Sequence, residues 1–339
     1  MKLTKLFAVA VIALAFTASS TFAAKKSSND GKLKVVTTIF PEYDWAKQII
    51  GEKADNVELT LLLNNGVDLH SYQPSVKDIA KISESDIFVY VGGESDGWVA
   101  DVIKNAKKPN LKVLNLLEIL GDKVKEEEIV EGMQTEDEHD HDEHGHDHHD
   151  EHDHDEDEEE VEYDEHVWLS LRNAQVLTAA ICDALCEKDA ANSAVYKKNL
   201  ASYNAKLSAL DNKYTDLVNN SSKKVILFGD RFPFRYMVDD YGLKYYAAFS
   251  GCSAESEASF KTIVFLSEKV NELGLQAVCQ IETGNGKIAR TIISNSKNRK
   301  AKVLTFDSLQ STTTKQINKG ATYYGAMEKN LEVLKEALK

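Results

Sequence analysis

Eight of the ten histidines lie in one acidic stretch, residues 136–160, which otherwise holds sixteen Asp or Glu and one Gly. Imidazole and carboxylate groups are ligands for borderline divalent metals such as Zn²⁺. Because the stretch has no apolar side chain to bury, we expect it to be disordered and to bind metal weakly at several exchangeable positions. A charged insertion with no role of its own is the alternative.

Only His70 and His166 lie outside that stretch. His70 belongs to the run Gly-Val-Asp-Leu-His-Ser-Tyr-Gln-Pro at 66–74, and His166 to the run Asp-Glu-His-Val-Trp-Leu at 164–169. Both runs read as loops near helix starts, where parallel α/β folds present ligands. A lone histidine is more often structural, but two in a chain with a His-rich stretch indicate a metal site.

Short β-rich runs alternate with helical patterns on both sides of the acidic stretch, which predicts parallel sheets flanked by helices. The expected strands are 34–38, 57–63, 87–91 and 112–115, then 225–228, 244–249, 277–281 and 302–306. Helices 173–186 and 190–218 lie between the two series, and the second is long enough to run between domains. The two successions of strands and helices, one on each side of the acidic stretch, begin with similar sequences. We therefore expect an α/β fold of two similar lobes, each a parallel sheet flanked by helices, joined by a long helix.

The composition is that of a globular protein of about two domains, with 339 residues of which 42% are hydrophobic. A formal charge of −15 argues against nucleic acid as a partner, yet without residues 136–160 the charge would be +1. A basic start, an apolar run and small residues predict a signal peptide over 1–24, cleaved after Ala23 or Ala24. No Cys follows the apolar run, so we expect export without a lipid anchor.

The sequence does not determine whether the four cysteines form disulfide bonds. Cys252 and Cys279 belong to the same series and could pair, whereas Cys182 and Cys186 are one helical turn apart, where disulfide geometry is poor. Buried free thiols are the alternative.

The two histidine runs resemble those of the metal-binding extracytoplasmic solute-binding proteins of bacterial ABC importers, the zinc/manganese type. The Gly-Gly-x-x-x-Gly-Trp-Val run at 92–99 and the segment 303–308 resemble the same family, and the similarity covers nearly all of 33–339. The resemblance implies an N-terminal lobe over 32–170, connecting helices over 171–220 and a C-terminal lobe over 223–339. It places the metal in the cleft between the lobes.

The resemblance also implies a site of four ligands, two from each lobe. His70 and His166 match the first two positions, and Asp307, in the run Thr-Phe-Asp-Ser, matches the fourth. Asp230 is the candidate for the third.

The third position departs from the family pattern. Counting back from Tyr241 puts Arg231 where the family has its ligand, and a guanidinium does not bind a metal. Asp230 precedes it by one residue, although an ion pair with Arg231 or Arg235 is its alternative role. Three acids are held in reserve: Glu255, Glu257 and Glu282.

The function implied by the resemblance is capture of Zn²⁺ and its delivery to a membrane permease and its ATPase, by a monomer that is not an enzyme and binds no nucleic acid. Mn²⁺ is the alternative metal, because two histidines with two carboxylates also serve manganese-binding members. The His-rich stretch favours zinc, since it would raise the metal concentration near the cleft. The chain could instead be a periplasmic zinc buffer, an adhesin or a zinc hydrolase, although no HExxH run supports the hydrolase.

Overall fold

The computed structural model describes residues 31–134, 162–253 and 257–339. Residues 32–339 form one compact unit, separate from Met1–Gly31. The expected signal peptide, the acidic stretch 136–160 and Glu255 lie outside the described residues. Among the helices of the described ranges, none is long and apolar enough to cross a membrane.

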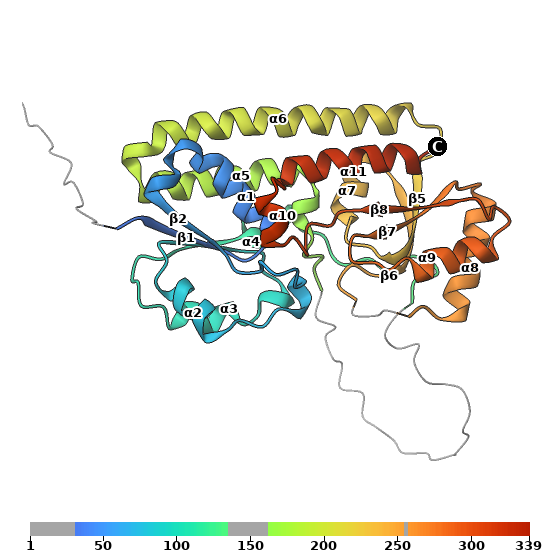
Figure 1. The fold of residues 1–339 in the computed structure, drawn as a ribbon, viewed down its shortest axis with the longest axis horizontal. Coiled ribbons are helices and arrows are strands. Elements are labelled where there is room, and N and C mark those ends of the chain that lie inside the picture. The colour runs from blue at the N-terminus through green and yellow to red at the C-terminus, as the bar shows by residue number, and fades with distance from the viewer. Residues whose placement is uncertain (1–30, 135–161, 254–256) are drawn as a thin grey trace, which may run out of the picture. The chain divides into compact units, whose positions relative to one another are not determined.

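The first sheet has four parallel strands in the order β2-β1-β3-β4 (Figure 1). Its strands are β1 (Leu33–Thr37), β2 (Val57–Leu61), β3 (Ile87–Tyr90) and β4 (Lys112–Asn115). The central strands β1 and β3 are buried over consecutive residues because helices cover both faces of a parallel sheet. Parallel strands bring their carboxyl ends to one edge, and the loop that carries His70 follows the carboxyl end of β2.

The second sheet repeats this arrangement with parallel strands in the order β6-β5-β7-β8. Its strands are β5 (Val225–Arg231), β6 (Lys244–Phe249), β7 (Ala277–Ile281) and β8 (Lys302–Phe306). In each sheet the first strand of the series lies between the second and the third, so the predicted pair of similar α/β lobes is confirmed. Strand β5 is longer than expected, because a shift in register against β6 between Phe228 and Arg231 lets it continue.

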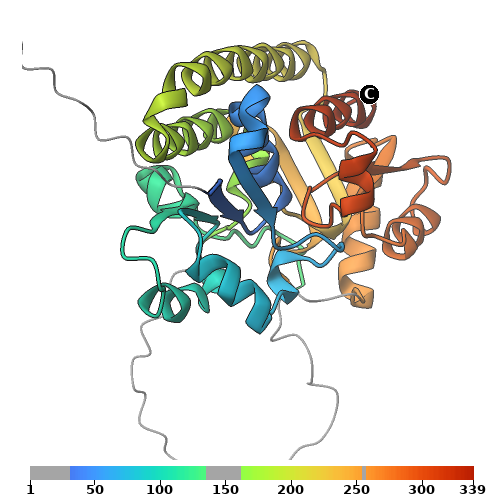
Figure 2. The same cartoon turned by 60° about the vertical axis from the view of Figure 1, so that its left-hand side comes forward.

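Helices flank both sheets. They are α1 (Phe40–Ile50), α2 (Val76–Ser83), α3 (Val99–Lys104), α4 (Leu116–Leu120), α5 (Leu171–Lys188), α6 (Ser193–Asn220), α7 (Arg235–Tyr241), α8 (Phe260–Glu272), α9 (Lys287–Asn295), α10 (Thr314–Asn318) and α11 (Tyr323–Ala337). Figures 1 and 2 show α5 and α6 on one side of the first sheet and α2 and α3 on the other. Helices α8, α9 and α11 pack against the second sheet.

The long helix α6 joins the two lobes. It packs against α1 beside the first sheet and against α7 and α11 beside the second. Asn199 donates a hydrogen bond to the backbone carbonyl of Ile49 at 3.0 Å, and the Tyr214 hydroxyl donates one to that of Met327 at 2.6 Å. Because one uninterrupted helix is fixed to both lobes, large changes in their relative position would break these contacts.

Trp168 is a second connection between the lobes. Its side chain is fully buried, and its indole Nε1 donates to the backbone carbonyl of Ser308, which follows β8, at 2.9 Å. The Tyr323 hydroxyl, at the start of α11, donates to the backbone carbonyl of Trp168 at 2.7 Å. The residues beside His166 are therefore anchored to the second lobe.

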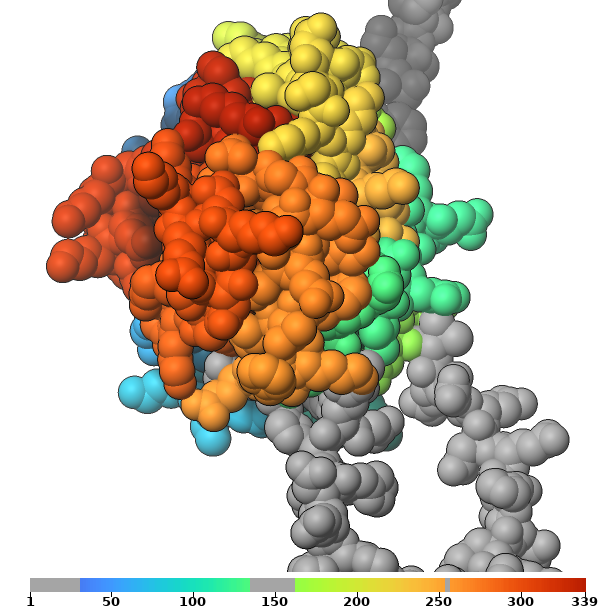
Figure 3. Space-filling model, turned by 90° about the vertical axis from the view of Figure 1, so that its right-hand side faces the viewer, coloured from blue at the N-terminus to red at the C-terminus, as the bar shows by residue number. Residues whose placement is uncertain are grey.

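The segment 124–134 leaves the first sheet and lies on the second lobe, where Figure 3 shows it as a green strip against the orange surface. The backbone N–H of Lys125 donates to the Tyr236 hydroxyl at 3.0 Å, and that of Gln134 donates to the carbonyl of Ala248 at 3.0 Å. The acidic stretch thus begins in the chain directly after a segment bound to the second lobe.

All four cysteines are free thiols, so the possible bridge between Cys252 and Cys279 is not formed. Cys279 lies buried in the middle of β7, whereas Cys252 lies beyond the end of β6, so the two are held on different parts of the lobe. The sulfurs of Cys182 and Cys186 are 4.0 Å apart and also unbridged.

Candidate metal centre

The local structure around His70 is a turn stabilised by Asp68. Asp68 caps the short helix η2 (Leu69–Ser71), and its Oδ1 accepts a hydrogen bond from the backbone N–H of His70 at 3.1 Å. His70 Nδ1 lies 2.8 Å from the Ser95 hydroxyl and 3.5 Å from Glu165 Oε2. These partners occupy Nδ1 and leave Nε2 available to a ligand.

The backbone at His166 is stabilised in the same way, by an aspartate two residues earlier. Asp164 Oδ1 accepts from the backbone N–H of His166 at 2.8 Å and lies 2.9 Å from its Nδ1. Both histidines thus follow an aspartate by two residues, a spacing at which Asp side chains bond the backbone N–H ahead of them. The ring of His166 is fully buried, and its Nε2 is the nitrogen left for a ligand.

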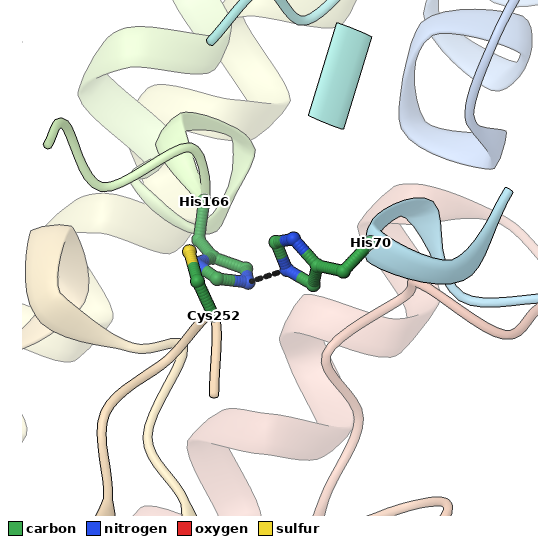
Figure 4. Close-up of side chains that lie close together, drawn as sticks. All are labelled: His70, His166 and Cys252. Atoms are coloured by element: carbon green, nitrogen blue, oxygen red, sulfur yellow. Dashed lines mark hydrogen bonds between the residues drawn. The ribbon is translucent and has the colours of Figure 1, made fainter. Parts of the chain in front are cut away.

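The two rings meet at their free nitrogens. His70 Nε2 and His166 Nε2 are 3.1 Å apart (Figure 4). A tetrahedral zinc ion bound to two imidazoles at its usual Zn–N distance would hold the nitrogens about 3.3 Å apart. The observed separation lies within about 0.2 Å of that value.

Burial and neighbouring charges shift the pKa values of the two rings in opposite directions. Burial and the neighbouring His166 lower the pKa of His70 to about 3. Burial opposes charging of His166 as well, but the Asp164 carboxylate raises the pKa of His166 above its usual range.

Cys252 is the third side chain at this point. One ligand atom from each of His70, His166 and Cys252 lies within 4.8 Å of the others. Burial and the Glu127 carboxylate raise the pKa of the Cys252 thiol, so it is protonated in the metal-free molecule. In the sequence, this cysteine stood out only as a possible disulfide partner. Its place shortly after the carboxyl end of a β-rich run is the one signal that it could reach the site.

The site opens into a cavity of about 280 Å³ with an acidic lining. Its lining residues are His70, Glu94, Ser95, Glu127, Glu162, Tyr163, Glu165 and Cys252. Carboxylates concentrated around one opening attract cations and raise their local concentration. Burial raises the pKa of Glu165, and among the described residues its Oε2 accepts no hydrogen bond, although it lies 3.5 Å from His70 Nδ1.

The two aspartates expected from the second lobe lie outside this group of three. Asp230 accepts hydrogen bonds from the backbone N–H groups of Arg231 at 2.9 Å and Ile281 at 3.2 Å, so it connects β5 to β7. Asp307 accepts from the backbone N–H of Leu309 at 2.9 Å. Burial and the charge of Glu282 raise the pKa of Asp307 to about 6.

The two reserve acids that the structure describes, Glu282 and Glu257, are engaged elsewhere. Glu282 accepts from the backbone N–H of Ser308 at 2.7 Å and from the hydroxyls of Ser308 and Ser311. Glu257 is exposed and lies 3.4 Å from Lys287 Nζ. Arg235, considered as a partner for Asp230, instead lies 2.7 Å from Glu128 and 3.0 Å from Asp239.

Arg231 connects the two lobes beside the site. Its Nη2 donates to Asp68 Oδ2 at 2.8 Å, and its Nη1 donates to the backbone carbonyl of Ser253 at 3.4 Å. Burial alone would raise the pKa of Asp68. The charge of Arg231 nevertheless holds that pKa below its usual range, so the pair is ionised. The guanidinium thus supports the turn that carries His70 and the loop that carries Cys252.

Replacing Arg231 with glutamine is expected to weaken zinc binding by about tenfold, because it removes a partner that orients a ligand rather than a ligand. Chelator competition on the purified chain measures this. Arg235→Gln is the matched control, since it removes an arginine of the same lobe that contacts Glu128 and Asp239 instead. Equal affinities for both variants would mean that the contact with Asp68 does not support the site.

The fold is that of a two-lobed α/β protein, and its paired histidines beside an acidic cavity are suited to hold a metal ion. The chain belongs to the family described as ZnuA, zinc-uptake complex component A, periplasmic, whose model matches residues 35–337. The resemblance seen in the histidine runs is therefore confirmed.

Individual relatives agree with this assignment. The chain is 32% identical over 320 residues to the high-affinity zinc uptake system protein ZnuA of Bacillus subtilis, covering 94% of this chain and 92% of that protein. It is 30% identical over 316 residues to the zinc-binding protein AdcA of Streptococcus pyogenes serotype M3, covering 92% of this chain but only 57% of that protein. The Zn(II)-bound ZnuA-like domain of Streptococcus pneumoniae AdcA superposes with a TM-score of 0.66 at 27% identity, covering 91% and 99% of the two chains.

Proposed function

We propose that the protein is the extracytoplasmic substrate-binding subunit of an ABC importer, and that it captures Zn²⁺ between its two lobes. The observation that carries the proposal is the pair of imidazole Nε2 atoms 3.1 Å apart, with both Nδ1 atoms occupied by partners. Zinc relatives that span nearly the whole chain support the same cargo. A membrane permease and its ATPase would receive the metal.

Zinc rather than Mn²⁺ is the proposed cargo because imidazole nitrogen binds zinc more strongly, as the Irving–Williams order states. The expected set of His70, His166, Asp230 and Asp307 included two carboxylates. Since Asp230 and Asp307 lie outside the group that the two histidines form with Cys252, the proposal rests on the two histidines. The chain binds and releases its cargo and catalyses no step.

The acidic stretch 136–160 is proposed to collect zinc for this site. Glu162, two residues beyond it in the chain, lines the acidic cavity that leads to His70. A segment tethered there delivers bound ions at a high effective concentration.

Deleting residues 136–160 is expected to lower the number of zinc ions bound per chain while the tight site keeps its affinity. Calorimetric titration of the full chain and the deletion variant measures both quantities. The physical reason is that His70 and His166 lie outside the deleted segment, whereas the eight histidines within it supply only weak positions. Loss of all zinc binding on deletion would refute a site between the lobes.

A further inference from the structure

Cys252 occupies the position from which a third ligand would complete the histidine pair. Its sulfur and one nitrogen of each ring lie within 4.8 Å of one another, and all three side chains meet beside the acidic cavity (Figure 4). With two imidazoles and one thiolate at usual bond lengths, a tetrahedral zinc would hold the sulfur about 3.6 Å from each nitrogen. Since the observed separations are at most 4.8 Å, a shift of about 1 Å would bring the sulfur to that distance from the nitrogens.

The loop around Cys252 is fixed from two sides. A Cβ at Gly251 would lie 3.0 Å from His166 Cε1 and 3.0 Å from the backbone oxygen of Phe232, so a larger side chain would crowd this approach to the ring. The backbone N–H of Cys252 donates to Glu127 Oε1 at 3.0 Å, across to the segment that precedes the acidic stretch. The thiol is therefore placed by packing and by a hydrogen bond.

Two of the acids considered for the third position already accept hydrogen bonds. Asp230 bonds the backbone of β7, and Glu282 bonds Ser308 and Ser311. Arg231 is turned to Asp68 and to the backbone carbonyl of Ser253, next to Cys252. The arginine thus supports the loop that carries Cys252.

We propose that Cys252 binds the captured ion as a thiolate, so that the site is formed by two imidazole nitrogens and one sulfur. The inference rests on the proposed function, since it names a further ligand of that site. On binding, the metal–sulfur bond forms as the S–H bond breaks, and the proton passes to solvent. A thiolate makes the site selective for zinc, cobalt and cadmium over Mn²⁺, Mg²⁺ and Ca²⁺, because hard cations prefer oxygen ligands.

Cobalt is the probe that tests this directly, because Co²⁺ bound to a thiolate shows a near-ultraviolet charge-transfer band that nitrogen and oxygen ligands do not produce. We expect the band in the full chain and in the control Cys186→Ser, whose thiol lies on α5 away from the site. We expect Cys252→Ser to lack the band and to bind zinc at least about 100-fold more weakly, because a ligand is lost rather than a supporting contact.

Alkylation of the unmodified chain gives a second readout that needs no variant. Zinc is expected to slow the labelling of Cys252, located by mass spectrometry, and to leave that of Cys186 unchanged. A tight zinc site with no charge-transfer band and no protection of Cys252 would overturn the inference and leave the proposed function intact. The absence of any tight zinc site would overturn both.

Discussion

Replacing His166 with alanine is expected to weaken zinc binding at the tight site by at least about 100-fold, which is the upper end of the loss caused by removing a ligand's supporting contact. The ring is fully buried and its Nε2 lies 3.1 Å from His70 Nε2, so alanine removes one of two nitrogens that face the ion. His70→Ala is expected to have a similar effect. Chelator competition on the variant that lacks 136–160 measures the tight site alone.

Glu257→Gln is the control for these histidine variants. Glu257 was one of the reserve ligands, but it is exposed and paired with Lys287, so we expect no change in zinc affinity. Wild-type affinity in His166→Ala, with its fold shown intact by circular dichroism, would exclude this histidine as a ligand.

Replacing Trp168 with alanine is expected to lower the free energy of unfolding by about 3–5 kcal/mol, the range for truncating a large buried aromatic residue. The indole is fully buried, packs beside the His166 ring and donates to the backbone of Ser308 in the second lobe. Its loss would leave a cavity and an unsatisfied carbonyl where the lobes meet. Urea denaturation of the metal-free protein measures the change.

Trp98→Ala is the matched comparison. Trp98 is only partly buried, and within the described ranges its indole nitrogen donates no hydrogen bond, so we expect a smaller loss of stability. An equal loss from both tryptophans would show that the contact with Ser308 has no special part in holding the lobes together.

The fold could be predicted from the sequence because its strands are short apolar runs separated by amphipathic helices. Strands 244–249, 277–281 and 302–306 have the expected bounds. The short helices α4 and α10 were not anticipated, since five residues show too little periodicity to distinguish a helix from a loop. The continuation of β5 depends on a register shift against β6, which is a property of the pairing and not of either strand.

The site residues could be predicted only where the interactions that position them lie within one short segment of the sequence. The Asp-x-His spacing at His70 and His166 is readable because the aspartate and the histidine bond within one turn. Asp230 is different, since nothing in its own segment shows that its carboxylate will be used by the backbone of β7, about fifty residues later. Cys252 reaches the histidines through the close approach of Gly251, which only the three-dimensional packing reveals.

A crystal structure of the zinc-loaded protein, with anomalous data collected at the zinc and manganese edges, tests the central claim most directly. We predict one strong zinc peak between the lobes, about 2.0–2.1 Å from Nε2 of both His70 and His166. A fully occupied zinc peak that touches neither histidine, or a manganese ion bound there in preference to zinc when both are supplied, would contradict the account.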